Sequence, residues 1–145
     1  MYGTIIGDIV GSIYEFNNYR SKEFPLFKRE CFFTDDTVMS AAVAKALLEY
    51  KEIDNIDEFK NELINCMHSI GVKYPNCGYG GRFYDWIMCR EREPYNSFGN
   101  GSAMRVSPVG WYANSLAEAE LLAKATAEVT HNHPEGIKGA FRLRE

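Results

Sequence analysis

Apolar residues recur at helical spacing along most of the chain. In the opening segment the residues in helical register are Ile5, Ile6, Ile9, Val10, Ile13 and Tyr14. A strand is the alternative there, because Thr-Ile-Ile and Asp-Ile-Val favour β structure, but strict alternation is absent. From Val38 to Leu48 apolar residues occupy nearly every side of a second helix, which indicates burial on most faces. The pattern therefore predicts an all-α fold.

Three further helices are predicted from the same spacing and from end signals. A helix over about 57–70 has its apolar residues on one face, and Gly71 stops it. The capping box Ser-Leu-Ala-Glu opens another at Ser115, which ends near Thr130. Pro134 starts a last helix, since its missing N–H is harmless in a first turn. No repeat or linker divides the chain, so we expect residues 1–145 to form a single domain.

Composition limits the classes of binding partner and the cellular compartment that we expect for this protein. A net charge of −4 argues against a binder of nucleic acid or membranes that works through charge. No early apolar run is long enough to span a bilayer. The four cysteines, Cys31, Cys66, Cys77 and Cys89, form no C-x-x-C pair, which favours buried free thiols over a disulfide framework or a zinc site. We expect a cytoplasmic protein.

A stripe of small residues runs along the first predicted helix. Gly3, Gly7, Gly11 and Glu15 recur at every fourth position. Such a stripe would let another backbone approach closely, at a cost in helix propensity. Glu15 at its end is a candidate functional acid, and a solvated glutamate at a helix end is an equal alternative.

The most informative segment is Phe33-Thr34-Asp35-Asp36-Thr37, where a polar loop meets the apolar second helix. One carboxylate capping the helix and its neighbour solvated is the simplest interpretation. However, two carboxylates at the mouth of a buried helix repel each other and lose hydration unless a cation compensates them. Carboxylate oxygens suit Mg²⁺, Mn²⁺ or Ca²⁺. A divalent metal site is therefore the first hypothesis.

Two later loops contain candidate binding residues. The segment 97–105, Ser-Phe-Gly-Asn-Gly-Ser-Ala-Met-Arg, offers backbone N–H groups that can converge on an anion, with the charge of Arg105 nearby, although a plain turn is the alternative. Thr130-His131-Asn132-His133 lies between two predicted helices. No Cys or further His stands at ligand spacing, so loop structure or substrate contact is favoured there over zinc binding.

Five ordered segments together resemble the ADP-ribosylglycohydrolase family of all-helical, magnesium-dependent enzymes. They are Gly7-Asp8-Ile9-Val10-Gly11-Ser12 followed by Glu15, then Phe33-Thr34-Asp35-Asp36-Thr37, Gly78-Tyr79-Gly80-Gly81, Gly99-Asn100-Gly101-Ser102-Ala103-Met104-Arg105, and Thr130-His131-Asn132-His133-Pro134-Glu135-Gly136. They cover nearly the whole chain. The resemblance implies the family's orthogonal multi-helix fold.

The resemblance also implies roles for individual residues. Thr34, Asp35 and Asp36 would be ligands of a dinuclear Mg²⁺ centre, and Glu15 would act there as a ligand or an acid/base group, so that Glu15, Asp35 and Asp36 are the catalytic candidates. The phosphates and distal ribose of ADP-ribose would be held by Gly80, Gly81, Gly99, Asn100, Gly101, Ser102, Met104 and Arg105, with Phe98 and His131 lining the pocket. The implied reaction hydrolyses the bond from ribose C1 to a nitrogen or oxygen. The partner would be an ADP-ribosylated protein or a small ADP-ribose derivative.

The chain departs from the family pattern at its C-terminal end. Family members are longer and carry a second acidic motif of the D-x-D-T kind, whereas the last aspartate here is Asp85. We therefore expect a C-terminally truncated fold with weakened or mononuclear binding of Mg²⁺ or Mn²⁺. The alternatives to a hydrolase are an ADP-ribose or nucleotide binding module and an inactive remnant. Ile137, Ala140 and Phe141 share one face of the last helix, which we expect to be exposed and covered by a homo-oligomer or a complementing chain.

Overall fold

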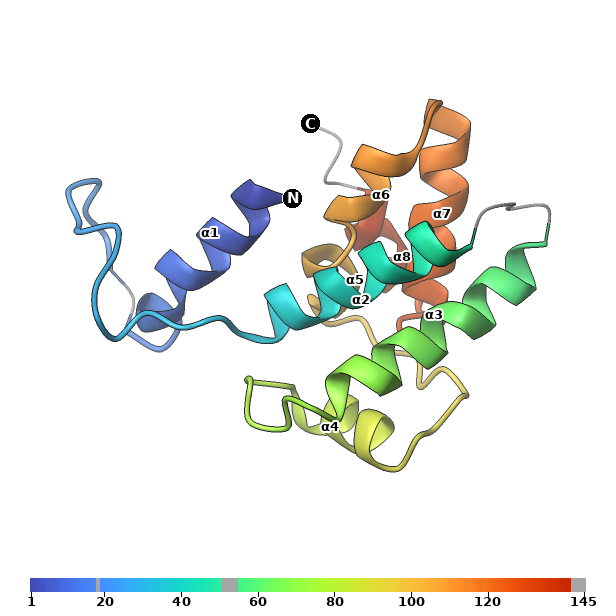
Figure 1. The fold of residues 1–145 in the computed structure, drawn as a ribbon, viewed down its shortest axis with the longest axis horizontal. Coiled ribbons are helices and arrows are strands. Elements are labelled where there is room, and N and C mark those ends of the chain that lie inside the picture. The colour runs from blue at the N-terminus through green and yellow to red at the C-terminus, as the bar shows by residue number, and fades with distance from the viewer. Residues whose placement is uncertain (18, 51–54, 142–145) are drawn as a thin grey trace.

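The computed structural model describes residues 1–17, 19–50 and 55–141, and all of their regular secondary structure is helical (Figure 1). The elements are α1 (Tyr2–Gly11), the 3₁₀ turn η1 (Ser12–Tyr14), α2 (Asp35–Glu49), α3 (Ile56–Gly71), α4 (Gly81–Met88), α5 (Gly101–Met104), α6 (Ser107–Tyr112), α7 (Leu116–Glu128) and α8 (Pro134–Phe141). The all-α prediction is confirmed.

Helix ends follow local side-chain signals. The side chain of Asn55 accepts hydrogen bonds from the backbone N–H groups of Asp57 and Glu58, which starts α3. The Ser115 side chain accepts from the N–H of Glu118, so the capping box is confirmed. The short helix α6 was not predicted, because its six residues, which include Pro108, are too few to show a helical period.

The core forms around α2. This helix packs against α3 and α6, and α3 also packs against α7 (Figure 1). The large side chains that are almost completely buried include Met39, Leu47, Phe59, Leu63, Met67 and Leu122. Each such side chain contributes roughly 1.5–3 kcal/mol through burial, so the position of α2 is well defined. The N-terminal end of α2, which carries the two aspartates, is therefore presented on a firm support.

Asp8 attaches α1 to the start of α2. Its carboxylate accepts hydrogen bonds from the backbone N–H of Thr34 at 2.8 Å and of Thr37 at 3.1 Å, and from both threonine hydroxyls. A carboxylate at a helix N-terminus satisfies free N–H groups and interacts favourably with the helix dipole. A residue of one helix thus caps another and sets the position of the intervening Asp35 and Asp36.

The glycine stripe of α1 does not serve close packing in this structure. A Cβ added at Gly3, Gly7 or Gly11 would meet no described atom within 4 Å. The predicted close approach of another backbone is therefore wrong for the part of the chain described. The stripe points into open space because α1 lies to one side of the helices around α2 (Figure 1).

The last helix also differs from expectation. Ala140 is only 4% exposed, and Ile137 and Phe141 pack against the core, because α8 lies against α5 and α7. The expectation that this face is exposed is wrong. Because this face packs within the chain, its apolar residues give no reason to expect that another chain must cover them.

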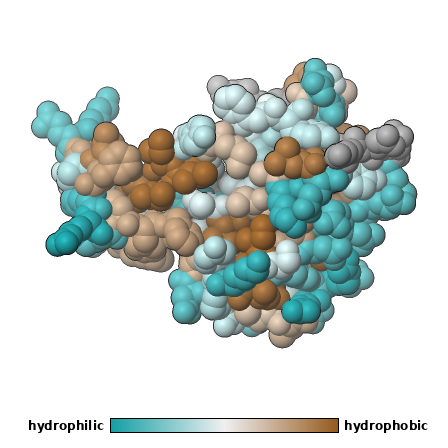
Figure 2. Space-filling model, viewed as in Figure 1, coloured by the Kyte–Doolittle hydropathy of each residue, from teal (hydrophilic) through white to brown (hydrophobic). Residues whose placement is uncertain are grey.

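Exposed apolar side chains gather elsewhere. Several lie in the segment between η1 and α2, where Figure 2 shows tan surface: Phe16, Tyr19, Phe24, Leu26, Phe27, Phe32 and Phe33.

The four cysteines are free, although only Cys66 and Cys77 are buried. Within the described residues, none of the helices has the length and apolar character needed to cross a membrane.

Candidate functional site

A cavity of about 470 Å³ lies where the N-terminal end of α2 meets α4 and the segment that leads into α5. Ligand pockets in proteins typically have volumes of roughly 300–1,000 Å³. Its lining residues are Glu15, Asp35, Asp36, Gly78, Gly80, Gly81, Arg82, Phe83, Tyr95, Ser97, Gly99, Asn100, Gly101, Met104, Arg105 and His131. The pocket thus combines residues from all five segments singled out in the sequence.

Backbone geometry places the two aspartates at the mouth of α2. Thr34 is extended and is the N-cap, and its side chain accepts a hydrogen bond from the N–H of Asp36. The N–H of Asp35 donates to the carbonyl of Cys77 at 2.9 Å. Gly78 follows with a φ of +106°, which strongly favours glycine, and its missing Cβ would lie 3.5 Å from Asp35 Oδ1. The turn and the helix end therefore fit closely together.

These carboxylates repel one another in a partly desolvated place. Burial, followed by the negative charges of Asp36, Glu15 and Asp8, raises the pKa of Asp35 to about 7. Burial, followed by the charges of Asp8 and Glu15, also raises the pKa of Asp36. No ion pair to these groups is found among the described residues. A hard divalent cation would fit this concentration of oxygen ligands and negative charge.

The atoms of the predicted metal ligands do not all lie close enough together to surround one ion in this structure. Among the described residues, the one group of three acidic or sulfur ligands whose atoms lie within 4.8 Å of one another is Glu49, Glu62 and Cys66, on α2 and α3. There the ammonium of Lys45 lies 3.1 Å from Glu49, and burial raises the pKa of Cys66 to about 12. A neutral thiol beside a lysine is a poor metal site.

Only part of the segment around α5 lines the cavity. Gly99, Asn100, Gly101 and Met104 line the cavity, and Gly101 opens the one-turn helix α5, so the segment is not wholly a loop. Ser102 is buried, and its hydroxyl donates to the carbonyl of Gly136 at 2.6 Å, away from the lining residues.

Two other predicted site residues also lie outside the lining. Phe98 is 73% exposed, with its ring 5.4 Å from that of His133. Thr34 is buried, and its hydroxyl donates to Asp8. Roles for Ser102, Phe98 and Thr34 at the site stay predictions.

His131 fills the space that the glycines leave. It is 3% exposed, and a Cβ at Gly101 would lie 2.9 Å from its Cε1 atom. Burial, together with the charge of Arg105, lowers the pKa of His131 to about 3, so the imidazole is neutral. The absence of a side chain at Gly101 is therefore a packing requirement of the histidine.

Arg105 lines the pocket from a fully buried position. Its side chain is fully buried, and Nη2 donates to the carbonyl of Thr126 at 2.7 Å and to Thr130 Oγ1 at 2.8 Å. Burial lowers its pKa to about 10, which leaves it charged at neutral pH. Nε and Nη1 have no hydrogen-bond partner within the described parts of the chain. Arg105 therefore supplies positive potential to the pocket from a buried position.

The family model for ADP-ribosylglycohydrolase matches residues 1–142. The chain belongs to the ADP-ribosylglycohydrolase family. Relatives named ADP-ribosylhydrolase ARH3 are 27% identical in Mus musculus, 29% in Gallus gallus and 28% in Homo sapiens, each over 96% of this chain. The alignments cover only 44%, 46% and 45% of those proteins, so the chain spans less than half of their length.

Sequence reasoning missed part of this ADP-ribosylglycohydrolase pocket. Arg82 donates from Nη2 to the carbonyl of Tyr95 at 2.6 Å and lies 4.8 Å from the centre of that ring, and both residues line the cavity. Nothing in the local sequence connects residues 82 and 95. Asp8 could have been recognised from the sequence as important, because it is an acid within an apolar helical segment. Its hydrogen bonds to α2 explain that acid.

Proposed function

We propose that this chain takes part in Mg²⁺- or Mn²⁺-dependent hydrolysis of the N- or O-glycosidic bond between ADP-ribose and a modified side chain or a small molecule. The observation that carries the proposal is the pocket itself, in which Glu15, Asp35 and Asp36 lie with two glycine-rich segments. The names of the ARH3 relatives support the same reaction class.

The carboxylates would hold the metal. Glu15, Asp35 and Asp36 offer hard oxygen ligands whose mutual repulsion a divalent cation would relieve. Thr34 would join them only if its hydroxyl turned away from Asp8. A bound divalent cation would polarise the attacking water and clamp the ribose hydroxyls. Because the ligand atoms of the three carboxylates do not all lie within 4.8 Å of one another here, we expect weak or single-ion binding.

The other lining residues would bind and orient the substrate. Gly80 is the N-cap of α4 and Gly81 its first residue. A Cβ at either would meet nothing within 4 Å, and the first N–H groups have no partner within the helix, so phosphate oxygens can approach. Gly99 to Gly101 and His131 would contact the ribose and diphosphate. Glu15 would orient the attacking water or transfer its proton, as an oxocarbenium-like transition state requires.

A binding module without turnover is the second candidate. It is favoured by the same open arrangement of the carboxylates. Such a protein would bind ADP-ribose through the glycine segments and His131. It would not release ADP-ribose from a modified substrate.

The deciding experiment measures binding and turnover in one series. Purified chain with Mg²⁺ or Mn²⁺ is incubated with peptides ADP-ribosylated on arginine or on serine, and free ADP-ribose is quantified. Calorimetry measures ADP-ribose affinity in parallel. Turnover that disappears in the Asp35→Asn/Asp36→Asn variant supports the hydrolase. Affinity without turnover supports the binding module, and the absence of both contradicts each proposal.

A further inference from the structure

The imidazole of His131 is enclosed on two edges. An ideal Cβ at Gly101 would lie 3.0 Å from Nε2, and one at Gly99 would lie 3.9 Å from the same nitrogen. The other ring nitrogen, Nδ1, lies 2.8 Å from Thr130 Oγ1. No hydrogen bond to Nε2 is found among the described residues, and His131 lines the pocket. Nε2 is therefore the ring nitrogen left for a ligand.

The hydroxyl of Thr130 determines which nitrogen carries the proton. A guanidinium can only donate, so Arg105 Nη2, 2.8 Å away, uses Thr130 Oγ1 as an acceptor. The hydroxyl proton of Thr130 is then free to donate, and Nδ1 of His131 is the acceptor at hand. If Nδ1 donated instead, the proton of this fully buried hydroxyl would have no acceptor among the described residues, a state that folded proteins avoid.

We propose that Thr130, oriented by Arg105, is a positioning residue that holds His131 as the Nε2–H tautomer, so that the imidazole donates a hydrogen bond to an acceptor oxygen of ADP-ribose. The identity of the ligand rests on the proposed function. The tautomer rests on the protein contacts alone, from Arg105 to Thr130 to His131. The low pKa of His131 is consistent with it, because a neutral imidazole has one donor and one acceptor.

The arrangement also gives Arg105 a purpose that an exposed phosphate ligand would not have. Its charge is shielded from solvent, and its Nη2 donates to the carbonyl of Thr126 and to the hydroxyl of Thr130. A buried guanidinium keeps one direction of donation permanently, since it stays protonated. Because Arg105 always donates to Thr130, the Thr130 hydroxyl donates in turn to Nδ1 of His131.

The first test is the tautomer in the free protein. Nitrogen-15 spectra of the full chain report whether each imidazole nitrogen carries a proton, and a His131→Phe variant identifies the signals that belong to His131. We expect an unprotonated Nδ1 and a protonated Nε2. A protonated Nδ1 in the parent protein overturns the proposal, whatever the variants do.

Two matched variants test the role of the hydroxyl. Thr130→Val removes the hydroxyl, and with it the acceptor of Arg105 Nη2, whereas Thr130→Ser keeps the hydroxyl. We expect Thr130→Val to shift His131 toward the Nδ1–H tautomer and to weaken ADP-ribose binding about tenfold, and Thr130→Ser to restore both within about twofold. An unchanged tautomer in a folded Thr130→Val protein overturns the proposal.

The readouts separate this proposal from the proposed function. If Thr130→Val does not fold, the parent and Thr130→Ser spectra decide, because a serine that loses the Nε2–H tautomer also overturns it. If ADP-ribose binds neither parent nor variants, the proposed function fails. The donation of this hydrogen bond to ADP-ribose fails with it, while the spectra still decide the tautomer.

Discussion

Asp35 is the residue at which charge, burial and the candidate function meet. Its carboxylate lies over Gly78, beside Asp36, in a place that raises its pKa to about 7. A carboxyl group with such a pKa is half protonated at neutral pH. A cation bound there would offset both the burial of the carboxylate and its repulsion from the neighbouring acids.

Replacing Asp35 by Asn is expected to separate stability from metal binding. The melting temperature without metal should stay the same or rise at pH 8, because one buried like charge is removed. The stabilisation that Mg²⁺ gives the parent should be lost. Differential scanning fluorimetry with and without Mg²⁺ measures both. Asp85→Asn, at an exposed position of α4, is the control and should behave like the parent.

Metal binding should also depend on pH. A pKa of about 7 in the folded protein, above the ordinary 3.8, means that protons compete with the cation at Asp35 up to neutral pH. Mg²⁺ affinity measured by calorimetry should therefore rise from pH 6 to pH 8. Because the pKa of Asp35 is higher in the folded than in the unfolded state, its contribution to the stability of the metal-free protein should fall as pH rises from about 4 to 7. Equal affinity at both pH values would contradict the raised pKa.

At the scale of elements, the pocket depends on contacts between segments far apart in sequence. Asp8 of α1 caps α2, and His131 after α7 packs against Gly101 at the start of α5. Each contact places one predicted motif against another. Their loss should affect folding and binding together.

Gly101→Ala is expected to destabilise the protein by about 1–3 kcal/mol, because the new Cβ would lie 2.9 Å from the His131 ring. A valine there is therefore not a clean probe of ligand binding, although no positive φ restricts Gly101. Gly110→Ala in α6 is the matched control: its Cβ meets nothing within 4 Å, and helix propensity should add about 0.5–1 kcal/mol. Urea unfolding measures both variants. Equal stability of the two would show that the ring moves aside freely.

Removing the Asp8 carboxylate is expected to loosen the start of α2. Asp8→Ala leaves the N–H groups of Thr34 and Thr37 without their partner, at a cost of about 2–3 kcal/mol in unfolding free energy. Amide hydrogen exchange should show faster exchange at residues 34–37 in this variant than in Asp85→Ala. Unchanged protection would mean that α2 is capped well enough by Thr34.

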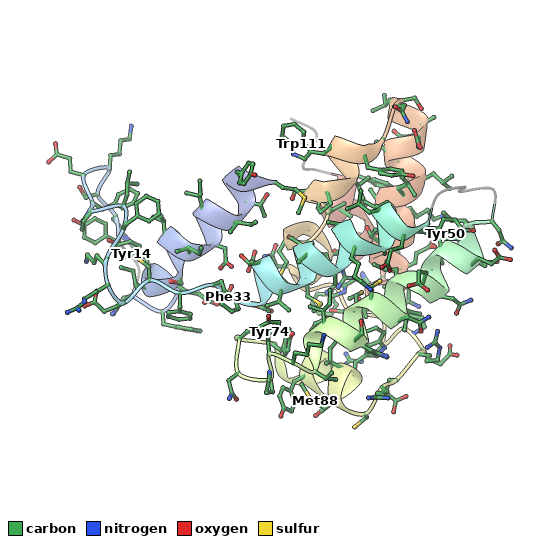
Figure 3. All side chains as sticks on the ribbon, viewed as in Figure 1. Tyr14, Phe33, Tyr50, Tyr74, Met88 and Trp111 are labelled. Atoms are coloured by element: carbon green, nitrogen blue, oxygen red, sulfur yellow. The ribbon has the colours of Figure 1, made fainter. Side chains whose placement is uncertain are left out.

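At the scale of the whole molecule, apolar side chains are exposed away from the candidate site. A groove lies on α6, α7 and α8, and its lining includes Val109, Trp111, Ala123 and Phe141. Trp111 is 78% exposed and extends from α6 at the edge of the molecule (Figure 3). An exposed tryptophan beside an apolar groove is typical of an interaction surface.

We expect this groove to mediate self-association at micromolar concentration. Light scattering should show a species larger than the monomer, and Trp111→Asp should shift it toward the monomer. Leu48→Asp, which changes another residue that is 73% exposed but lies outside the groove, is the control and should leave the association unchanged. A clean monomer in the parent protein would contradict the expected oligomer.

Much of this structure was predictable from the sequence because its signals are local. Helical spacing and caps such as Ser115 depend on residues within one or two turns of each other, and the helices they predict are present. The acidic pair and the glycine segments were recognisable as motifs for the same reason, and the pocket includes both. The helix α6 was missed where the local signal was too short.

The tertiary structure decided which residues meet and in what state. No local rule brings Asp8 to Thr37, Arg82 to Tyr95 or Arg105 to Thr130, because each pair is joined only by the packing of separate segments. The same packing turned Ser102 away from the pocket and buried Arg105. The pKa of Asp35 and the neutrality of His131 follow from burial and neighbouring charge, which depend on distances between side chains that the order of residues does not contain.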